Sequence, residues 1–231
     1  EGDEVRLRHN FLDLWEYNFS SLESSEAAQN IRALHDSGVT VHHDPITVKV
    51  IFPDENLDAV MRAVLGKQPD EEITAAELAK IKWLDAANKG IADLTGIEYC
   101  TNLEALYLND NRISDLSPLS SLTNLIEIRL WSNEISDISA LSSLTSLSWL
   151  YLSDNRITDV SALTSLTNLI WLILKGNQIS DISPLLENGG LGEGDEIWLE
   201  GNPLDLENVE GLLKSVQALE SRGVVVHGVP H

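Results

Sequence analysis

The sequence has 231 residues, of which 37 are acidic and 15 are basic, so its formal net charge is −22. A surface this negative repels phosphate backbones and anionic lipid, which excludes nucleic acid and membrane surfaces as expected partners. The single cysteine, Cys100, excludes an internal disulfide, and no apolar run approaches the roughly 20 residues of a membrane-spanning helix, so we expect no membrane insertion.

The start of the chain repeats its end. Residues 1–14 align with residues 193–206, and residues 38–39 and 41–42 align with residues 223–224 and 226–227. We therefore expect residues 1–45 to be the last repeat and cap of a preceding unit. A strand at residues 5–7 would offer unpaired edge groups, so one expectation is self-association through residues 1–45.

Residues 46–80 are predicted to form a helical N-terminal cap. Gly66 is placed to end a first helix, and Thr74 followed three residues later by Glu77 predicts a capping box that opens a second, short helix. The apolar residues of the first helix recur at helical spacing: Leu57, Val60, Met61, Val64 and Leu65.

Residues 81–205 contain a pattern that recurs every 22 residues. A full copy runs from Leu103 through Leu106, Leu108 and Asn111 to Ile113, in the form L-x-x-L-x-L-x-x-N-x-I. In-phase copies start at residues 125, 147 and 169, a degenerate copy precedes them, and a last copy follows a three-residue insertion. This is the leucine-rich-repeat pattern. No single repeat can bury its own leucines, so neighbouring repeats must stack.

An asparagine follows each strand of the repeat except that of the degenerate first copy, which has Lys89 there. The asparagine amide can satisfy backbone groups of adjacent turns. We expect these residues to form a structural ladder: Asn111, Asn133, Asn155, Asn177 and Asn202. After each repeat aspartate, a Ser-Pro or Ser-Ala pair such as Ser117-Pro118 suits an N-cap and a first helical residue. Only a short turn fits before the next leucine, which predicts a 3₁₀-type return segment.

The sequence thus predicts an α/β solenoid. It is a leucine-rich-repeat horseshoe with a parallel β-sheet on the concave face, short 3₁₀-type turns on the convex side, and helical N- and C-terminal caps. Residues 206–231 form the C-terminal cap, with a helix and a final strand at residues 224–227. Residues 1–45 are then the C-terminal end of a preceding leucine-rich-repeat unit. The apolar stripe of the cap helix is Val209, Leu212, Leu213, Val216 and Leu219.

Strand positions between the inward leucines point onto the concave face. They hold five of the chain's six tryptophans and two of its four tyrosines, and exposed aromatics on this scale indicate an interface. Trp149 and Trp171 are expected to be near-stacked neighbours on adjacent strands. The predicted ligand-binding residues are Trp83, Tyr107, Arg129, Trp131, Trp149, Tyr151, Trp171, Lys175 and Trp198.

Three further features carry a family resemblance: the repeated Ile-Ser-Asp-Ile/Leu-Ser-Pro-Leu, the linking Leu-Thr-Asn-Leu at residues 122–125 and 166–169, and the lead-in from Phe52. Over residues 50–200 the chain resembles the internalin-type bacterial leucine-rich-repeat proteins. The resemblance implies a surface-displayed or secreted bacterial protein that binds host or environmental macromolecules. It does not specify the ligand.

The expected function is a non-catalytic binding module of a secreted or cell-surface bacterial protein, with a protein ligand on the concave face. Two alternatives stay open: a glycan-binding module that uses the Trp/Tyr platform, and a structural spacer of tandem solenoids. We expect no catalytic residues, no cofactor and no metal, because loop aspartates more often cap turns than bind calcium. The histidines at positions 42, 43, 227 and 231 are interpreted as surface residues.

Overall fold

The computed structural model describes residues 4–6, 40–42, 48–204 and 209–229. The chain divides into two compact units, Glu1–Val48 and Lys49–His231. Among the described residues, no helix combines the length and the apolar character that a membrane crossing requires.

Two strands of the first unit are described by the structure. β1 (Glu4–Arg6) and β2 (Thr40–His42) run parallel, with Val5 opposite Val41. β10 (Glu196–Trp198) and β11 (Val225–His227) pair in the equivalent register, with Ile197 opposite Val226. The backbone pairing of the first unit therefore matches the repeat that residues 1–45 resemble in sequence. The rest of that predicted segment, at residues 1–3, 7–39 and 43–45, lies outside the described residues.

The N-terminal cap contains a short antiparallel pair, β3 (Lys49–Val50) with β4 (Ile73–Thr74), and the helix α2 (Glu55–Leu65). The Asp54 carboxylate accepts hydrogen bonds from the backbone N–H groups of Asn56 and Leu57, which satisfies the first turn of α2. Gly66 ends the helix as predicted, in the left-handed conformation at φ 67°. One apolar member of the predicted stripe, Val64, is exposed rather than buried.

The predicted capping box is confirmed at α3 (Ala75–Leu78). The backbone N–H of Glu77 donates to Thr74 Oγ1, and the backbone N–H of Thr74 donates to Glu77 Oε2 at 3.0 Å. Lys67 Nζ lies 2.7 Å from Glu77 Oε1. The Lys67 hydrogen bond, followed by that from Thr74, lowers the pKa of Glu77 to about 2.

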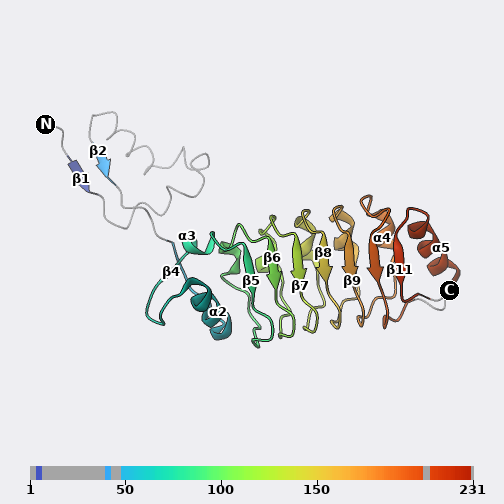
Figure 1. Ribbon diagram of the computed structural model, residues 1–231, viewed down its shortest axis with the longest axis horizontal. Helices are drawn as coiled ribbons and strands as arrows, with labels where there is room; N and C mark the ends of the chain where they lie inside the picture. Colours follow the sequence, from blue (N-terminus) through green and yellow to red (C-terminus); the bar gives the residue numbers. More distant parts are fainter. Residues whose placement is uncertain (1–3, 7–39, 43–47, 205–208, 230–231) are drawn as a thin grey trace. The chain divides into compact units, whose positions relative to one another are not determined.

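The second unit is built on a seven-stranded parallel sheet whose strands follow chain order from β5 to β11, with α5 (Val209–Glu220) beside β11 (Figure 1). The repeat strands between the caps are β5 (Trp83–Asp85), β6 (Ala105–Tyr107), β7 (Glu127–Arg129), β8 (Trp149–Tyr151), β9 (Trp171–Ile173) and β10. The solenoid and parallel-sheet prediction is confirmed.

The core consists of rows of aliphatic side chains that run from repeat to repeat. The central residue of each strand lies opposite the central residue of the next, so that Leu106 follows Leu84 and precedes Ile128. All three side chains are fully buried. In α5 the residues Leu212, Val216 and Leu219 are buried, whereas Val209, predicted on the same stripe, is exposed.

The return segments are short 3₁₀ helices in four repeats: η1 (Ile97–Tyr99), η2 (Ser117–Leu119), η3 (Ser139–Ser143) and η4 (Ser161–Ser165). The fifth departs from the prediction, because α4 (Ser183–Glu187) is an α-helix. It precedes the insertion in the repeat, which provides room for a wider turn.

The predicted N-cap role of the serines is wrong. Ser117 is the first residue of its turn, and its backbone N–H donates to Asp115 Oδ1 at 2.8 Å. The same bond links Ser183 to Asp181. A carboxylate two residues upstream reaches the free N–H, as in an Asx turn, so the aspartate satisfies the turn and the serine does not.

The asparagines hydrogen-bond to consecutive repeats. Asn155 Oδ1 accepts from the Ile135 N–H of the repeat before at 3.0 Å, and its Nδ2 donates to Leu130 O at 2.9 Å and to Leu152 O at 3.1 Å. One amide therefore satisfies backbone groups of two turns. The same pattern occurs at Asn111, Asn133, Asn177 and Asn202.

A second, exposed series of asparagines precedes the strands, and we call it the lead-in ladder. Nδ2 of Asn102, Asn124 and Asn168 donates to the backbone oxygen of Ala79, Thr101 and Thr145 respectively, 23 residues earlier. Ser146 occupies the equivalent position in the repeat between Asn124 and Asn168. Its short side chain interrupts the ladder.

Replacing the buried asparagine in Asn155→Ala should lower the free energy of unfolding by about 2–4 kcal/mol. The Ile135 N–H loses its acceptor, which costs roughly 1–3 kcal/mol. Leu130 O and Leu152 O each lose one of two donors and keep Asn133 and Asn177, which costs about 0.5–1.5 kcal/mol per bond. Urea unfolding measures the difference. Asn124→Ala is the matched control, because its one bond is exposed, and it should cost less than about 1 kcal/mol. Equal losses would contradict the ladder as the stabilising contact.

Acid should weaken the N-terminal cap through Glu77. Because the folded-state pKa of Glu77 is lowered from 4.5 to about 2, its contribution to stability is complete above pH 4.5 and is lost as the pH falls through 2. Glu77→Gln keeps a capping-box partner and removes the charge. The melting temperature of wild type should therefore exceed that of the variant at pH 6, and the gap should close towards pH 2. A gap independent of pH would refute this account.

Candidate ligand-binding face

The outward positions of the sheet form three columns, which we call the sheet face. Strand pairing in register aligns the first two columns, and the third lies two residues beyond the second. The first contains Trp83, Ala105, Glu127, Trp149, Trp171, Glu196 and Val225. The second contains Asp85, Tyr107, Arg129, Tyr151, Ile173, Trp198 and His227. The third contains Ala87, Asn109, Trp131, Ser153, Lys175 and Glu200.

Arg129 lies at the centre of a first group of side chains, the Arg129 cluster. Its guanidinium carbon is 4.0 Å from the ring centre of Tyr107, 5.5 Å from that of Tyr151 and 6.0 Å from that of Trp131. Its Nε donates to Glu127 Oε1 at 2.7 Å. Burial lowers the pKa of Arg129, but the hydrogen bond and charge of Glu127 outweigh it, so the pKa lies above its usual value.

The rings of the Arg129 cluster are held by one another. Trp83 and Tyr107 meet edge to face at 5.8 Å, as do Trp131 and Tyr151 at 6.1 Å. The Tyr107 hydroxyl donates to Glu127 Oε2 at 3.2 Å. Burial, then the negative charge of Glu127, raises the pKa of Tyr151. The cluster is therefore ordered by contacts on all sides before any ligand arrives.

Trp198 lies at the centre of a second group, the Trp198 cluster. Its ring stacks on His227 at 3.8 Å and lies 6.1 Å from the ring of Trp171. Lys175 Nζ is 4.1 Å from the centre of the Trp198 ring and 3.5 Å from Glu200 Oε1. His227 Nε2 is 3.1 Å from Glu196 Oε2. Lys175 and His227 thus each contact the Trp198 ring and one carboxylate.

Two polar side-chain atoms of the Trp198 cluster have no hydrogen-bond partner in the part of the chain that the structure describes. Among the described residues, Trp198 Nε1 and Glu200 Oε2 are buried and have no hydrogen-bond partner. Buried polar atoms are nearly always paired in native proteins, and an unpaired one costs free energy. The Arg129 cluster has no such atom within the described part of the chain.

The nine predicted ligand-binding residues all lie in the three columns. Trp83 is 55% exposed and Trp149 is 39% exposed, while the other seven are half-buried against each other. The expectation that Trp149 and Trp171 stack is wrong. Their backbones pair in register, but the Trp171 ring contacts Trp198 on the opposite side. The Trp171 ring thus packs towards β10, although both neighbouring strands carry a tryptophan.

His227 is the residue that the sequence interpretation missed. The sequence interpretation treats it only as a surface histidine. In the structure it continues the second column, because β11 pairs in register with β10. The signal was present in the sequence, since the final strand predicted at residues 224–227 extends the first two columns by one position. The other three histidines of that interpretation were at positions 42, 43 and 231, and their side chains lie outside the described residues.

The remaining candidate groups have structural roles. The aspartates at the return turns accept hydrogen bonds from their own serines, and within the described ranges no three His, Cys, Asp or Glu side chains gather as metal ligands. Cys100 is fully buried, and burial raises the pKa of its thiol to about 12. A thiol that stays protonated is a poor nucleophile.

Trp198→Ala should destabilise the protein by roughly 1–3 kcal/mol more than Trp149→Ala. Trp198 loses a stacked ring, a tilted ring and a cation, and aromatic pairs contribute about 0.5–1.5 kcal/mol each. Trp149 makes no ring contact in the described part of the chain, and it serves as the matched control. Urea unfolding of both variants measures the difference, and equal losses would show that the ring contacts of Trp198 do not stabilise the sheet face.

Comparison with known families supports the repeat assignment. The leucine-rich-repeat family, described as "Leucine Rich repeats (2 copies)", matches residues 80–121, 101–143, 123–165 and 145–187. Internalin H of Listeria monocytogenes is 40% identical over 81 residues, which are 33% of this chain and 15% of that protein. The chain thus spans a small part of this curated relative.

Solved structures give the same result at the level of the fold. An internalin from Listeria monocytogenes strain 4b F2365 is 32% identical with a TM-score of 0.65, over 80% of this chain and 59% of that one. Internalin C2 from the same strain is 27% identical with a TM-score of 0.56, over 81% of this chain and 93% of that one. The repeat sequence, the parallel sheet with 3₁₀ return turns and these matches show that residues 80–187 are leucine-rich repeats of the internalin type.

Proposed function

We propose that this chain is a non-catalytic binding module of a secreted or cell-surface protein, and that it recognises a protein ligand on the sheet face. The observation that carries the proposal is the concentration of rings and paired charges in the Arg129 and Trp198 clusters. The resemblance to internalins supports the location outside the cell.

The composition of the sheet face is that of a protein interface. In a chain with net charge −22, this face brings together Arg129, Lys175 and His227, each beside an aromatic ring. Tyrosine, tryptophan and arginine are enriched at the centres of interfaces and account for much of the binding energy. Because the rings already hold one another, little side-chain entropy is lost when a ligand binds.

The Trp198 cluster also has unmet hydrogen-bonding capacity. Trp198 Nε1 is a donor without an acceptor, and Glu200 Oε2 is an acceptor without a donor. A polar ligand that reorients these side chains would recover the free energy that the two atoms cost. A polypeptide supplies both kinds of group along its backbone.

A glycan is the second candidate, and one observation favours it. Trp83 and Trp149 are the two exposed rings of the first column, and they are three strands apart, or about 14 Å. Exposed flat rings at intervals suit the faces of a sugar polymer. The paired charges between them, Arg129 with Glu127, favour a protein ligand instead.

We also propose that the first unit is a second copy of the terminal repeat and cap. The support is the equivalent register of β1–β2 and β10–β11. Tandem copies of this kind fit the remaining alternative, a structural spacer of stacked solenoids. Self-association through residues 1–45 stays a prediction.

The double variant Trp83→Ala/Trp149→Ala tests the proposal, because it removes the two exposed rings and, of the ring contacts in the two clusters, only that between Trp83 and Tyr107. Its matched control is Ile51→Ala/Val64→Ala, which removes two exposed apolar side chains from the N-terminal cap. Wild type and both variants are assayed against a panel of extracellular proteins and a glycan array. We expect a protein ligand that binds wild type and control equally and the ring variant at least about 30-fold more weakly, the loss typical of a hot spot.

Three other results would each mean something different. Binding confined to glycans and lost with the two rings would support the second candidate. A ligand that binds the ring variant as tightly as wild type would place recognition elsewhere. Absence of any ligand would favour the spacer.

A further inference from the structure

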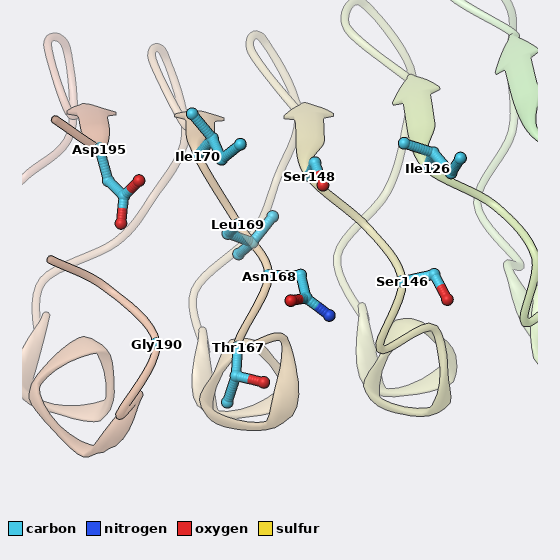
Figure 2. Close-up of a pocket in the computed structure, with 9 residues that line it drawn as sticks. All are labelled: Ile126, Ser146, Ser148, Thr167, Asn168, Leu169, Ile170, Gly190 and Asp195. Carbon is cyan, nitrogen blue, oxygen red and sulfur yellow. The ribbon is translucent and has the colours of Figure 1, made fainter.

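A hollow of about 500 Å³ lies on one flank of the sheet, beside the starts of β7 to β10 (Figure 2). The residue before each strand contributes to its rim. Backbone bonds join these positions from repeat to repeat: the Ser148 N–H donates to Ile126 O, and the Ile170 N–H donates to Ser148 O. We call the series Lys82, Glu104, Ile126, Ser148, Ile170 and Asp195 the flank row.

The hollow exists because one repeat has two small side chains. Ser148 stands between Ile126 and Ile170 in the flank row, and Ser146 stands between Asn124 and Asn168 in the lead-in ladder. Both serines line the hollow. The space that an isoleucine and an asparagine fill in the two neighbouring repeats is therefore open to solvent in this one.

The walls on either side of Ser148 are apolar. Ile126 is 38% exposed and Ile170 is 45% exposed, and no other isoleucine, leucine or valine of residues 81–204 is exposed. They lie two strand spacings apart, or about 10 Å. That separation admits one further aliphatic side chain, in the place that an isoleucine would take in this repeat.

The end of the hollow next to β10 is acidic. Asp195 lines it, and the Gly192 N–H donates to Asp195 Oδ2 at 2.8 Å, which orients the carboxylate. Within the described residues no cation pairs with Asp195, whereas the other two charges of the flank row, Lys82 and Glu104, pair with each other at 2.7 Å. An incoming positive charge would therefore find an uncompensated carboxylate.

The remaining wall is rigid. A Cβ on Gly190 would lie 1.9 Å from the backbone oxygen of Thr167, so two backbone segments meet there without an intervening side chain. Asn168, which also lines the hollow, is held by its bond to Thr145 O at 2.7 Å. The shape of the hollow is therefore largely formed before binding.

We propose that this hollow is a second docking site, distinct from the sheet face, for an extended partner segment that presents an aliphatic side chain next to an arginine or lysine. The aliphatic group lies over Ser148 between Ile126 and Ile170. The cationic group extends along the flank row to the Asp195 carboxylate. The proposal does not rest on the function assigned to the sheet face.

The probe is the dipeptide acetyl-Leu-Arg-amide, titrated into the full 231-residue chain labelled with ¹⁵N. Acetyl-Leu-Glu-amide is the matched control peptide. We expect saturable shifts of the backbone amides of Ser148, Ile170 and Asp195 with the arginine peptide, and at least tenfold weaker binding of the glutamate peptide. Absence of saturable shifts up to the solubility limit, or equal binding of the two peptides, would overturn the proposal.

Two variants assign the binding to the hollow. Ser146→Asn/Ser148→Ile restores the residues of the neighbouring repeats, and it should bind the arginine peptide at least tenfold more weakly while melting no lower than wild type. Asp195→Asn keeps an oxygen for the Gly192 N–H and should weaken binding at least fivefold, which provides a test even if the filled variant fails to fold. Unchanged binding in both folded variants would refute the site.

The sheet-face variant Trp83→Ala/Trp149→Ala separates the two proposals. If it loses the peptide while the filled variant retains it, the peptide binds the sheet face and the inference about the hollow is wrong. If the filled variant alone loses the peptide, the hollow is a site of its own, whatever the sheet face binds.

Discussion

Five consecutive turns of the solenoid end at an asparagine whose amide bonds to the backbone of the turn before it. Asn155 links Ile135 N–H and Leu130 O of one repeat to Leu152 O of its own. These bonds form only when the asparagine faces the matching backbone groups, so they fix the register between consecutive repeats. Everything else depends on that register: the rows of buried leucines, the outward columns of the sheet face, and the flank row beside them.

The fold was predictable because the repeat period alone specifies stacking. The parallel sheet, the 3₁₀ turns and the capping box at Thr74 follow from spacing and from local hydrogen-bonding rules. The predictions of the caps and return turns were wrong where the local sequence allows two different structures. Ser117 and Asp115 can both cap a turn, and only the geometry shows that the carboxylate does so. Likewise, the α-helix at Ser183–Glu187 depends on the room made by the insertion that follows it, which spacing does not reveal.

The sequence predicts which residues belong to the candidate site, but it does not predict how their side chains are arranged. Alternation along a strand places Trp171 on the outward face, but it does not say whether the ring leans towards Trp149 or Trp198. That choice is made by the side-chain rotamer, which strand alternation does not specify. The contribution of His227 needed the pairing of β11 with β10. The interruption of the lead-in ladder at Ser146 is visible in the sequence, but the flank-row position of Ser148 varies from repeat to repeat. The hollow and its acidic end at Asp195 therefore needed the structure.

The stacking of the strands also means that distances along the sheet face change only in whole steps. Arg129 is on β7 and Trp198 is on β10, so three strand spacings, or about 14 Å, separate the two clusters. Duplication or loss of one 22-residue repeat between them would lengthen or shorten that span by about 4.8 Å and leave each cluster internally unchanged. Such a protein can acquire a new specificity by recombination alone, because a single unequal crossover changes the spacing of its recognition elements without altering any of them.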